Sequence, residues 1–305
     1  MAENQSRDIP LPVKREVRQR CGFGCVICGL PLYEYEHMQG FAQVQRHVAE
    51  EISLLCDLHH KERTSGLLPL SEVVGADANP FNMRQGVSKP YNLHFSGSEC
   101  EVFIGSNRFT TSDGGYGAQM IAAIVDGIPL LGFVLTDGHL LLNVNIFDEY
   151  NSVVLRIDNN ELIQSSSPWD IELVGRNLVL RESARNILFD ITFDVPNRIT
   201  INRGRLLCNG VEIIIRPDHI LLTNNNTLIS GSTVLHTPLG LVIGDRSNVG
   251  SGAFYFPNIP RYVGDRSESI RWARESMKLH SHQSENRNDN ESPPKLTLPG
   301  VFSTD

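Results

Sequence analysis

The 305-residue sequence predicts an α+β protein, in which a small N-terminal module precedes an all-β domain and a disordered C-terminal tail. Three observations lead to this prediction. Cysteine and histidine residues with regular spacing frame a short segment near the N-terminus, at Cys25/Cys28 and Cys56/His59. Short β-branched runs separated by turn residues fill residues 91–262. From residue 280 onward the chain is polar and has little to bury, which is typical of disorder.

A helix is expected over residues 12–20, after a proline-marked start that looks disordered. Pro12 suits the first turn of this helix, because the amide hydrogen that proline lacks is not needed there. Val13 and Val17 are four residues apart and therefore lie on one face of the helix. We expect this face to point at the core of the module.

The cysteine and histidine pairs have the spacing of a zinc site. Two residues separate Cys25 from Cys28, and two separate Cys56 from His59. Each pair can form a tight knuckle that points two side chains at one ion, and such ligands suit tetrahedral Zn²⁺. Four protein ligands leave no open position, so the predicted zinc is structural and staples a segment too small to bury its own core. His60 is the alternative to His59 as the fourth ligand.

Polar residues between and beside these ligands indicate a second site. Glu36 and His37 follow the strand-like run Leu32-Tyr33-Glu34-Tyr35, and His60 follows the last predicted zinc ligand. A hairpin that carries Glu36 and His37, packed against a short helix that carries His60, would bring these groups round a second metal ion.

This pattern over residues 12–75 resembles an HNH endonuclease, the ββα-metal fold, in its zinc-stapled form. The resemblance implies that Glu36 and His60 bind a catalytic Mg²⁺ or Mn²⁺ and that His37 is the general base that activates water. The implied activity is metal-dependent hydrolysis of phosphodiester bonds in nucleic acid, with DNA as the expected substrate. Because HNH modules are common in phage, bacterial defence and mobile-element proteins, the analogy suggests a role against foreign DNA.

One position departs from the family pattern. The usual Asn, five residues before the third zinc ligand, is replaced by Glu51, and an ionised glutamate cannot donate a hydrogen bond. Glu51 itself or His47, which are the candidate supporting residues, takes over the orienting role, or catalysis is weakened or lost. The alternative to an enzyme is therefore a degenerate zinc-binding scaffold whose function is binding or structural, through the β-domain.

The distribution of charge permits a local contact with nucleic acid. The net charge is −8, which argues against a broadly basic binder. Residues 1–90 carry 10 Lys and Arg against 11 Asp and Glu, whereas the remainder carries 17 against 24, so most of the acidity lies outside the module. A nuclease needs only a local basic track for phosphates. The candidates for phosphate contacts are Lys14, Arg15, Arg18, Lys61 and Arg63. The residues from Lys14 to Arg20 would equally suit the solvated face of a helix.

After the module, Ser71 is a candidate cap for a closing helical turn, and residues 76–90 are expected to form a linker because they lack apolar periodicity. Strands follow over residues 91–262 at a spacing of about ten residues, with hairpin signals at Asp126-Gly127, Asp137-Gly138 and Asn209-Gly210. This pattern favours an antiparallel sandwich over a short β-solenoid. The polar residues of this domain assemble no catalytic set. We therefore expect it to bind or sense a ligand, to target or regulate the nuclease, or to assemble the protein into a homo-oligomer.

Residues 263–305 are expected to form a short helix followed by a disordered tail. No apolar run reaches the roughly 18 residues needed to span a bilayer, and the start of the chain lacks an apolar signal segment. Three of the six cysteines are assigned to zinc, and the other three are scattered rather than paired. These observations predict a cytoplasmic protein without a membrane partner.

Overall fold

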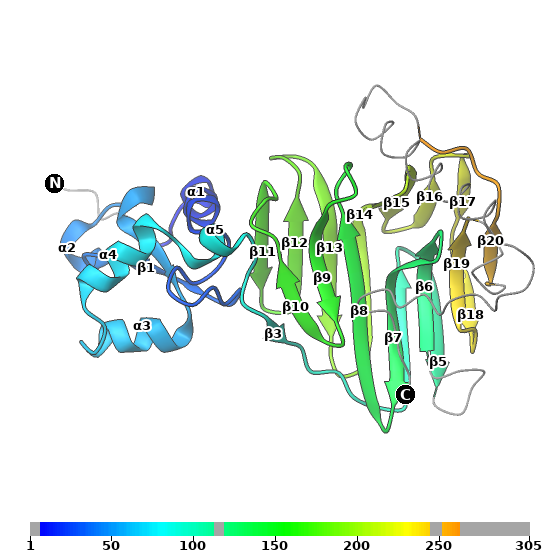
Figure 1. Cartoon of the computed structure of the whole chain (residues 1–305), viewed down its shortest axis with the longest axis horizontal. Coiled ribbons are helices and arrows are strands. Elements are labelled where there is room, and N and C mark those ends of the chain that lie inside the picture. Colours follow the sequence, from blue (N-terminus) through cyan, green and yellow to red (C-terminus); the bar gives the residue numbers. More distant parts are fainter. Residues whose placement is uncertain (1–6, 113–118, 245–251, 263–305) are drawn as a thin grey trace, which may run out of the picture. The chain divides into compact units, whose positions relative to one another are not determined.

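The computed structural model describes residues 7–112, 119–244 and 252–262 (Figure 1). These residues are mostly β-sheet with a few short helices, which confirms the predicted α+β class in this general form. They divide into two compact units. The N-terminal unit contains the described residues up to Leu93 together with Glu161–Leu188, and the β-rich unit contains His94–Asn160 and the described residues from Phe189 onward. The segment predicted as a module is thus part of a larger unit that draws on two stretches of the chain.

The N-terminal unit combines helices with short strands, which are numbered in chain order as in Figure 1. Its elements are α1 (Leu11–Cys21), β1 (Glu34–His37), α2 (Phe41–Val44), the 3-10 turn η1 (Ala49–Glu51), β2 (Ile52–Leu55), α3 (Asp57–Thr64), α4 (Leu70–Ala78), α5 (Phe81–Gln85), β3 (Tyr91–Asn92), β10 (Glu161–Gln164), β11 (Asp170–Val174) and β12 (Asn177–Arg181). The strands pair as three antiparallel couples: β1 with β2, β3 with β10, and β11 with β12.

Helix α1 closely matches the prediction. It ends at Gly22, whose φ of 72° places it in the left-handed region that glycine favours at a helix C-terminus. The amide of Gly22 bonds the Arg18 carbonyl. Val17 is fully buried and Val13 packs against the same core, so the predicted apolar face is confirmed.

Strands β1 and β2 and helix α3 form the strand–strand–helix order that the sequence suggested. In the antiparallel register of β1 and β2, Glu36 lies opposite Ser53 and His37 opposite Ile52. All four residues of β2 are buried, and three of them, Ile52, Leu54 and Leu55, belong to the hydrophobic core of this unit. Helix α3 begins directly after Cys56, so the rigid strand β2 fixes where the helix starts.

Residues 76–90 are packed structure in this unit, although they were expected to form a linker. They include the end of α4 and the whole of α5. Within α5, Asn82 is only 1% exposed, and its Nδ2 donates to the carbonyl of Gly22 at 2.8 Å. The expected cap at Ser71 is also wrong, because α4 starts after Pro69 without a side-chain capping bond. Proline and polar residues hid these helices from a search for apolar periodicity.

The β-rich unit consists of strands in two sheets. Its strands are β4 (Glu99–Ile104), β5 (Asn107–Ser112), β6 (Gln119–Val125), β7 (Ile128–Thr136), β8 (His139–Phe147), β9 (Val153–Asp158), β13 (Ile187–Asp194), β14 (Arg198–Cys208), β15 (Val211–Arg216), β16 (His219–Leu222), β17 (Thr227–Ile229), β18 (Thr233–Leu235), β19 (Leu239–Ile243) and β20 (Phe254–Phe256). One sheet runs in the order β20-β19-β6-β7-β8-β9. The other runs β13-β14-β15-β16-β17, with β4 also beside β14, β5 beside β4, and β18 beside β5.

All three predicted hairpin turns are confirmed. Asp126-Gly127, Asp137-Gly138 and Asn209-Gly210 each have positive φ at both residues and join antiparallel strands. This conformation matches the right-handed twist of paired strands, and Asp-Gly and Asn-Gly adopt it with little strain.

The two sheets share a core, but the expectation of purely antiparallel pairing needs correction. The ring of Phe95 lies 5.3 Å from that of Phe133 in one sheet and 6.4 Å from that of Phe193 in the other. Among the described strands, four pairs are parallel: β4 with β14, β5 with β18, β6 with β19, and β19 with β20. Strands joined by a tight turn must be antiparallel, whereas strands that meet after a long connection can meet in either direction.

The expected C-terminal helix and tail lie outside the described residues. Within the described residues, Cys21, Cys100 and Cys208 are buried free thiols. A search of the described helices found none long and apolar enough to cross a membrane.

Candidate metal centre and catalytic cluster

The four predicted zinc ligands come together in the N-terminal unit. The donor atoms of Cys25, Cys28, Cys56 and His59 all lie within 4.8 Å of one another. Among the described residues, this is the one group of three or more Cys, His, Asp or Glu side chains that is so closely gathered. The cluster can therefore hold a metal ion, as the spacing predicted.

Local backbone structure builds the two halves of this cluster. The first knuckle closes through a bond from the Gly29 amide to the Cys25 carbonyl at 2.7 Å. Gly29 has a φ of 77°, and a Cβ there would lie 2.3 Å from the Phe81 ring, so only glycine fits. The second half lies at the start of α3, where Cys56 precedes the helix and His59 is in its first turn.

The distances between the donor atoms fit a tetrahedral zinc ion. The sulfurs of Cys28 and Cys56 are 3.7 Å apart, and Nδ1 of His59 lies 3.3 Å from the sulfur of Cys25 and 3.2 Å from that of Cys56. Zn–S bonds of about 2.3 Å and Zn–N bonds of about 2.0–2.1 Å at tetrahedral angles separate two sulfurs by about 3.8 Å and a sulfur from a nitrogen by about 3.6 Å. Three thiolates and one imidazole are also the donors that Zn²⁺ prefers.

The electrostatics of the cluster favour the thiolate form at Cys25, whereas a hydrogen bond with Cys25 raises the pKa of Cys28 and burial raises that of Cys56. A hydrogen bond with the neighbouring Cys28 side chain lowers the pKa of Cys25 to about 4, although burial opposes the shift. Metal binding requires deprotonated thiols, so a cysteine that already favours the thiolate needs to release no proton when an ion enters.

The choice between His59 and His60 is settled by their places on α3. His59 belongs to the cysteine cluster, whereas His60 contacts two glutamates of β1. Its Nε2 lies 3.1 Å from Oε2 of Glu36, and its Nδ1 lies 3.2 Å from Oε2 of Glu34. His60 thus belongs to a second cluster, separate from the zinc ligands.

Glu36 and His60 have the separation of neighbouring ligands of one hard cation. Two ligands at right angles, each about 2.1 Å from an ion, are about 3.0 Å apart, close to the 3.1 Å observed. The Glu36 side chain is 17% exposed, and burial raises the pKa of its carboxyl group. A carboxylate and an imidazole at this separation could hold one cation between them.

His37 lies in a different pair from Glu36 and His60. Its Nε2 is 3.1 Å from Nδ1 of His47, and the ring of Phe41 stacks on His47 and meets His37 at its edge. Successive residues of a strand point to opposite faces, which separates His37 from Glu36. Burial, and then the neighbouring His47, lower the pKa of His37, which favours the neutral form of its ring.

Glu51, at the position of the usual Asn, forms an ion pair with Arg46. Nε of Arg46 donates to Oε2 of Glu51 at 3.0 Å. Burial and His47 lower the pKa of His37, and the Glu51 carboxylate raises it by a smaller amount. Both supporting candidates, Glu51 and His47, therefore lie near the predicted base.

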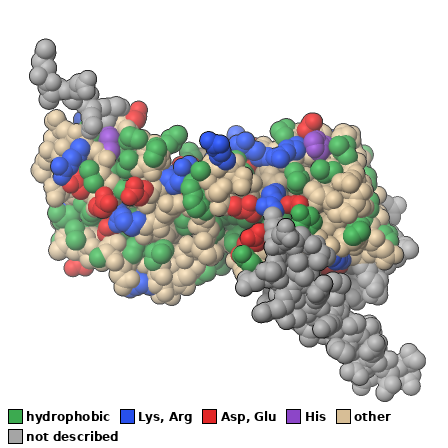
Figure 2. Space-filling view, turned by 90° about the horizontal axis from the view of Figure 1, so that it is seen from above, with side chains coloured by type: hydrophobic (Ala, Val, Ile, Leu, Met, Phe, Trp, Pro, Cys, Tyr) green, Lys and Arg blue, Asp and Glu red, His purple; other side chains and the backbone are tan. Residues whose placement is uncertain are grey.

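The basic residues around the site have different surroundings. Arg63 donates a hydrogen bond to the carbonyl of Met38 at 3.1 Å, and its positive charge partly offsets the raised pKa of Glu36. Lys61 is exposed on α3. On the face drawn in Figure 2, acidic and basic side chains alternate over the N-terminal unit rather than forming a continuous basic area.

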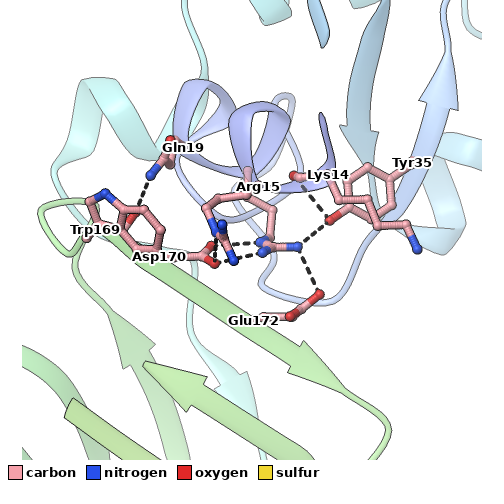
Figure 3. A network of polar contacts seen from close by, with 8 residues as sticks. Lys14, Arg15, Gln19, Tyr35, Trp169, Asp170 and Glu172 are labelled. Carbon is pink, nitrogen blue, oxygen red and sulfur yellow. Dashed lines mark hydrogen bonds and ion pairs between the residues drawn. The ribbon is translucent and has the colours of Figure 1, made fainter. Parts of the chain in front are cut away.

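The basic residues of α1 take part in a polar network with β11 (Figure 3). Arg18 is only 2% exposed and holds Asp170 through two bonds, from Nε to Oδ1 at 2.8 Å and from Nη2 to Oδ2 at 2.7 Å. Arg15 also donates to Asp170, at 3.2 Å, and its guanidinium lies 4.7 Å from the centre of the Trp169 ring. The Lys14 ammonium lies 5.7 Å from the centre of the Tyr35 ring.

The assignment of Arg18 to a phosphate track is therefore wrong. Its guanidinium is buried and already bonded to Asp170, Glu172 and Tyr35, so its charge is neutralised inside the unit. Sequence reasoning treated α1 as a helix with one apolar face, and nothing in the local pattern marked Arg18 as a core residue.

Sequence reasoning also missed Glu34 and Asp170. Glu34 is two residues before Glu36, and the two-residue repeat of a strand places both on one face, so this signal was available. Asp170 follows Arg18 by 152 residues and carried no local signal.

Comparison of this chain with protein-family models, curated proteins and solved structures found no match.

Proposed function

We propose that this protein is a metal-dependent endonuclease of the HNH type that hydrolyses phosphodiester bonds in DNA. The observation that carries the proposal is the 3.1 Å separation of Glu36 Oε2 from His60 Nε2, next to a Cys₃His cluster. The same helix, α3, supplies His59 to the cluster and His60 to the second pair. A zinc ion at the cluster would therefore also fix the catalytic pair.

Each residue of the second cluster has a role in this proposal. Glu36 and His60 hold a Mg²⁺ or Mn²⁺ ion, which when bound supplies charge stabilisation at the scissile phosphate and at the leaving oxygen. His37 is the general base, and its lowered pKa keeps it ready to accept a proton from water at neutral pH.

His47 takes the orienting role of the usual Asn. A neutral imidazole that donates from Nε2 has its lone pair on Nδ1. When Nε2 of His37 donates to His47, at 3.1 Å, Nδ1 is therefore the nitrogen left to accept the proton. Phe41 holds the His47 ring by stacking, with the two planes inclined by 12°.

Arg63 and Lys61 anchor the phosphate backbone of the substrate. Arg63 is tied by one bond to the carbonyl of Met38, close to the end of β1, and Lys61 is exposed on the same helix. Two cations on α3 suit a local contact with phosphates in a protein whose overall charge is negative. In this scheme the β-rich unit targets or regulates the nuclease.

The test is a plasmid-nicking assay with Mg²⁺ or Mn²⁺, run on the purified full chain with its zinc content measured alongside. Wild type is expected to nick DNA with one zinc per chain, and Glu36→Gln and His37→Ala are expected to lose nicking and keep the zinc. His219→Ala is the matched control, because His219 pairs with Asp218 in the other unit. A zinc-loaded wild type that cuts neither DNA nor RNA with any divalent metal overturns the enzyme.

The second candidate is a zinc-stapled scaffold without catalysis. Two observations favour it: Glu51 is held by Arg46, and His37 lies with His47 rather than with Glu36. This alternative predicts that His37→Ala leaves the function of the protein untouched, whereas Cys56→Ala unfolds the N-terminal module.

A further inference from the structure

Both ring nitrogens of His60 face carboxylates. Oε2 of Glu34 lies 3.2 Å from Nδ1, and Oε2 of Glu36 lies 3.1 Å from Nε2. The two glutamates are two residues apart on β1 and therefore on the same face of the strand, above α3. His60 is thus held from both sides by one strand.

The two carboxylates differ in their exposure. The side chain of Glu36 is 17% exposed, whereas that of Glu34 is 56% exposed. An imidazole binds a cation through the lone pair of one nitrogen and carries its proton on the other. Glu36 is the better partner for a shared cation, because its carboxylate is less exposed and fewer water molecules compete with the cation for its oxygens. The more exposed Glu34 suits the protonated nitrogen.

We propose that Glu34 is a positioning residue, which accepts a hydrogen bond from Nδ1–H of His60 and so directs the lone pair of Nε2 toward Glu36. Histidines that bind metals almost always donate their other N–H to a carboxylate, carbonyl or water, and this partner fixes both the tautomer and the ring orientation. Without Glu34, the ring of His60 is free to turn over and to place Nδ1 beside Glu36. The inference rests on the proposed function, because it assigns Glu36 and His60 to one cation.

The tautomer of His60 provides a test that needs no nuclease activity. Two-bond ¹H–¹⁵N correlation spectra of the zinc-loaded full chain, recorded at pH 8 without Mg²⁺ or Mn²⁺, distinguish the Nδ1–H from the Nε2–H form. The second measurement is Mn²⁺ affinity, from the loss of the free-ion signal in electron paramagnetic resonance.

Three variants make the test specific. Glu34→Ala removes the acceptor and is expected to shift His60 toward the Nε2–H form and to weaken Mn²⁺ binding about 10- to 100-fold. Glu34→Gln keeps an acceptor oxygen and is expected to retain the wild-type tautomer. Glu16→Ala removes the same charge from an exposed position on α1 and is expected to change neither measurement.

The results separate this inference from the proposed function. A wild type with the Nε2–H form, or a Glu34→Ala variant that keeps both the tautomer and the Mn²⁺ affinity of wild type, overturns the role of Glu34. If Glu34→Ala changes the tautomer but wild type binds no Mn²⁺, the positioning by Glu34 stands and the endonuclease is overturned.

Discussion

Replacing Asp170 with alanine should destabilise the N-terminal unit far more than breaking an exposed ion pair. Asp170 is 1% exposed, and its two carboxylate oxygens accept hydrogen bonds from Nε and Nη2 on one edge of the buried Arg18 guanidinium, at 2.8 and 2.7 Å. Alanine at this position leaves a positive charge in the interior without its principal partner.

The structure gives the size of the effect. Removing one partner of a buried ion pair costs about 3–5 kcal/mol, because the remaining charge is no longer compensated. Arg18 keeps its bonds to Tyr35 and Glu172, both at 2.8 Å, so we expect a loss of about 3 kcal/mol, at the lower end of this range. The pair of Arg46 with Glu51 is accessible to solvent and should contribute much less, because water screens the two charges.

Urea unfolding followed by tryptophan fluorescence measures this loss. Trp169 adjoins Asp170 and lies under Arg15, so it reports on the N-terminal unit. The other tryptophan, Trp272, lies outside the described residues and is replaced by phenylalanine in every variant. Glu51→Ala serves as the control for an exposed pair.

A double variant tests the physical cause. Arg18→Met combined with Asp170→Leu removes both charges and keeps apolar volume, so it should recover most of the stability lost in Asp170→Ala. The reasoning is refuted if Asp170→Ala costs no more than Glu51→Ala, or if the double variant is less stable than Asp170→Ala.

Three further predictions concern zinc, acid stability and close packing. Cys56→Ala should lose the bound zinc and unfold residues 12–75; metal analysis and circular dichroism check this, and a variant that retains its zinc would argue against the site. Burial raises the pKa of Glu101, but hydrogen bonds from two arginines lower it by more, so the pKa is lower in the folded than in the unfolded protein. The stabilisation by Glu101 is therefore complete above the unfolded pKa of about 4.3 and disappears as the pH falls toward the folded pKa. Urea titrations at pH 6 and pH 3 should therefore show a smaller loss of stability for Glu101→Gln than for wild type, and an equal loss would contradict the shift. Gly132→Ala places a Cβ 2.5 Å from a backbone oxygen of the neighbouring strand and should cost about 1–3 kcal/mol in thermal unfolding. The control Gly75→Ala lies in a helix with open space around it and should instead stabilise by about 0.5–1 kcal/mol.

The features that the sequence predicted well are local ones. Each zinc knuckle depends on the geometry of a few consecutive residues, so the spacing of Cys25, Cys28, Cys56 and His59 was sufficient to predict the cluster. The Asp-Gly and Asn-Gly turns were predictable for the same reason, since the two residues alone determine the backbone conformation.

The features that the sequence did not predict depend on distant parts of the chain. Arg18 is a core residue only because Asp170 lies beside it, and no pattern near either residue reports the other. The parallel pairing of β6 with β19 likewise follows from packing after a long excursion of the chain.

The N-terminal unit is assembled from two separate stretches of the chain, and this has a consequence for biosynthesis. Residues 161–188 leave the ribosome long after the cysteines have emerged, and they include the partner of Arg18. A nascent chain that stops short of this hairpin holds every zinc ligand but leaves the guanidinium of α1 without its carboxylate. Translation must therefore pass residue 170 before Arg18 can form its buried ion pair and the N-terminal unit can be complete.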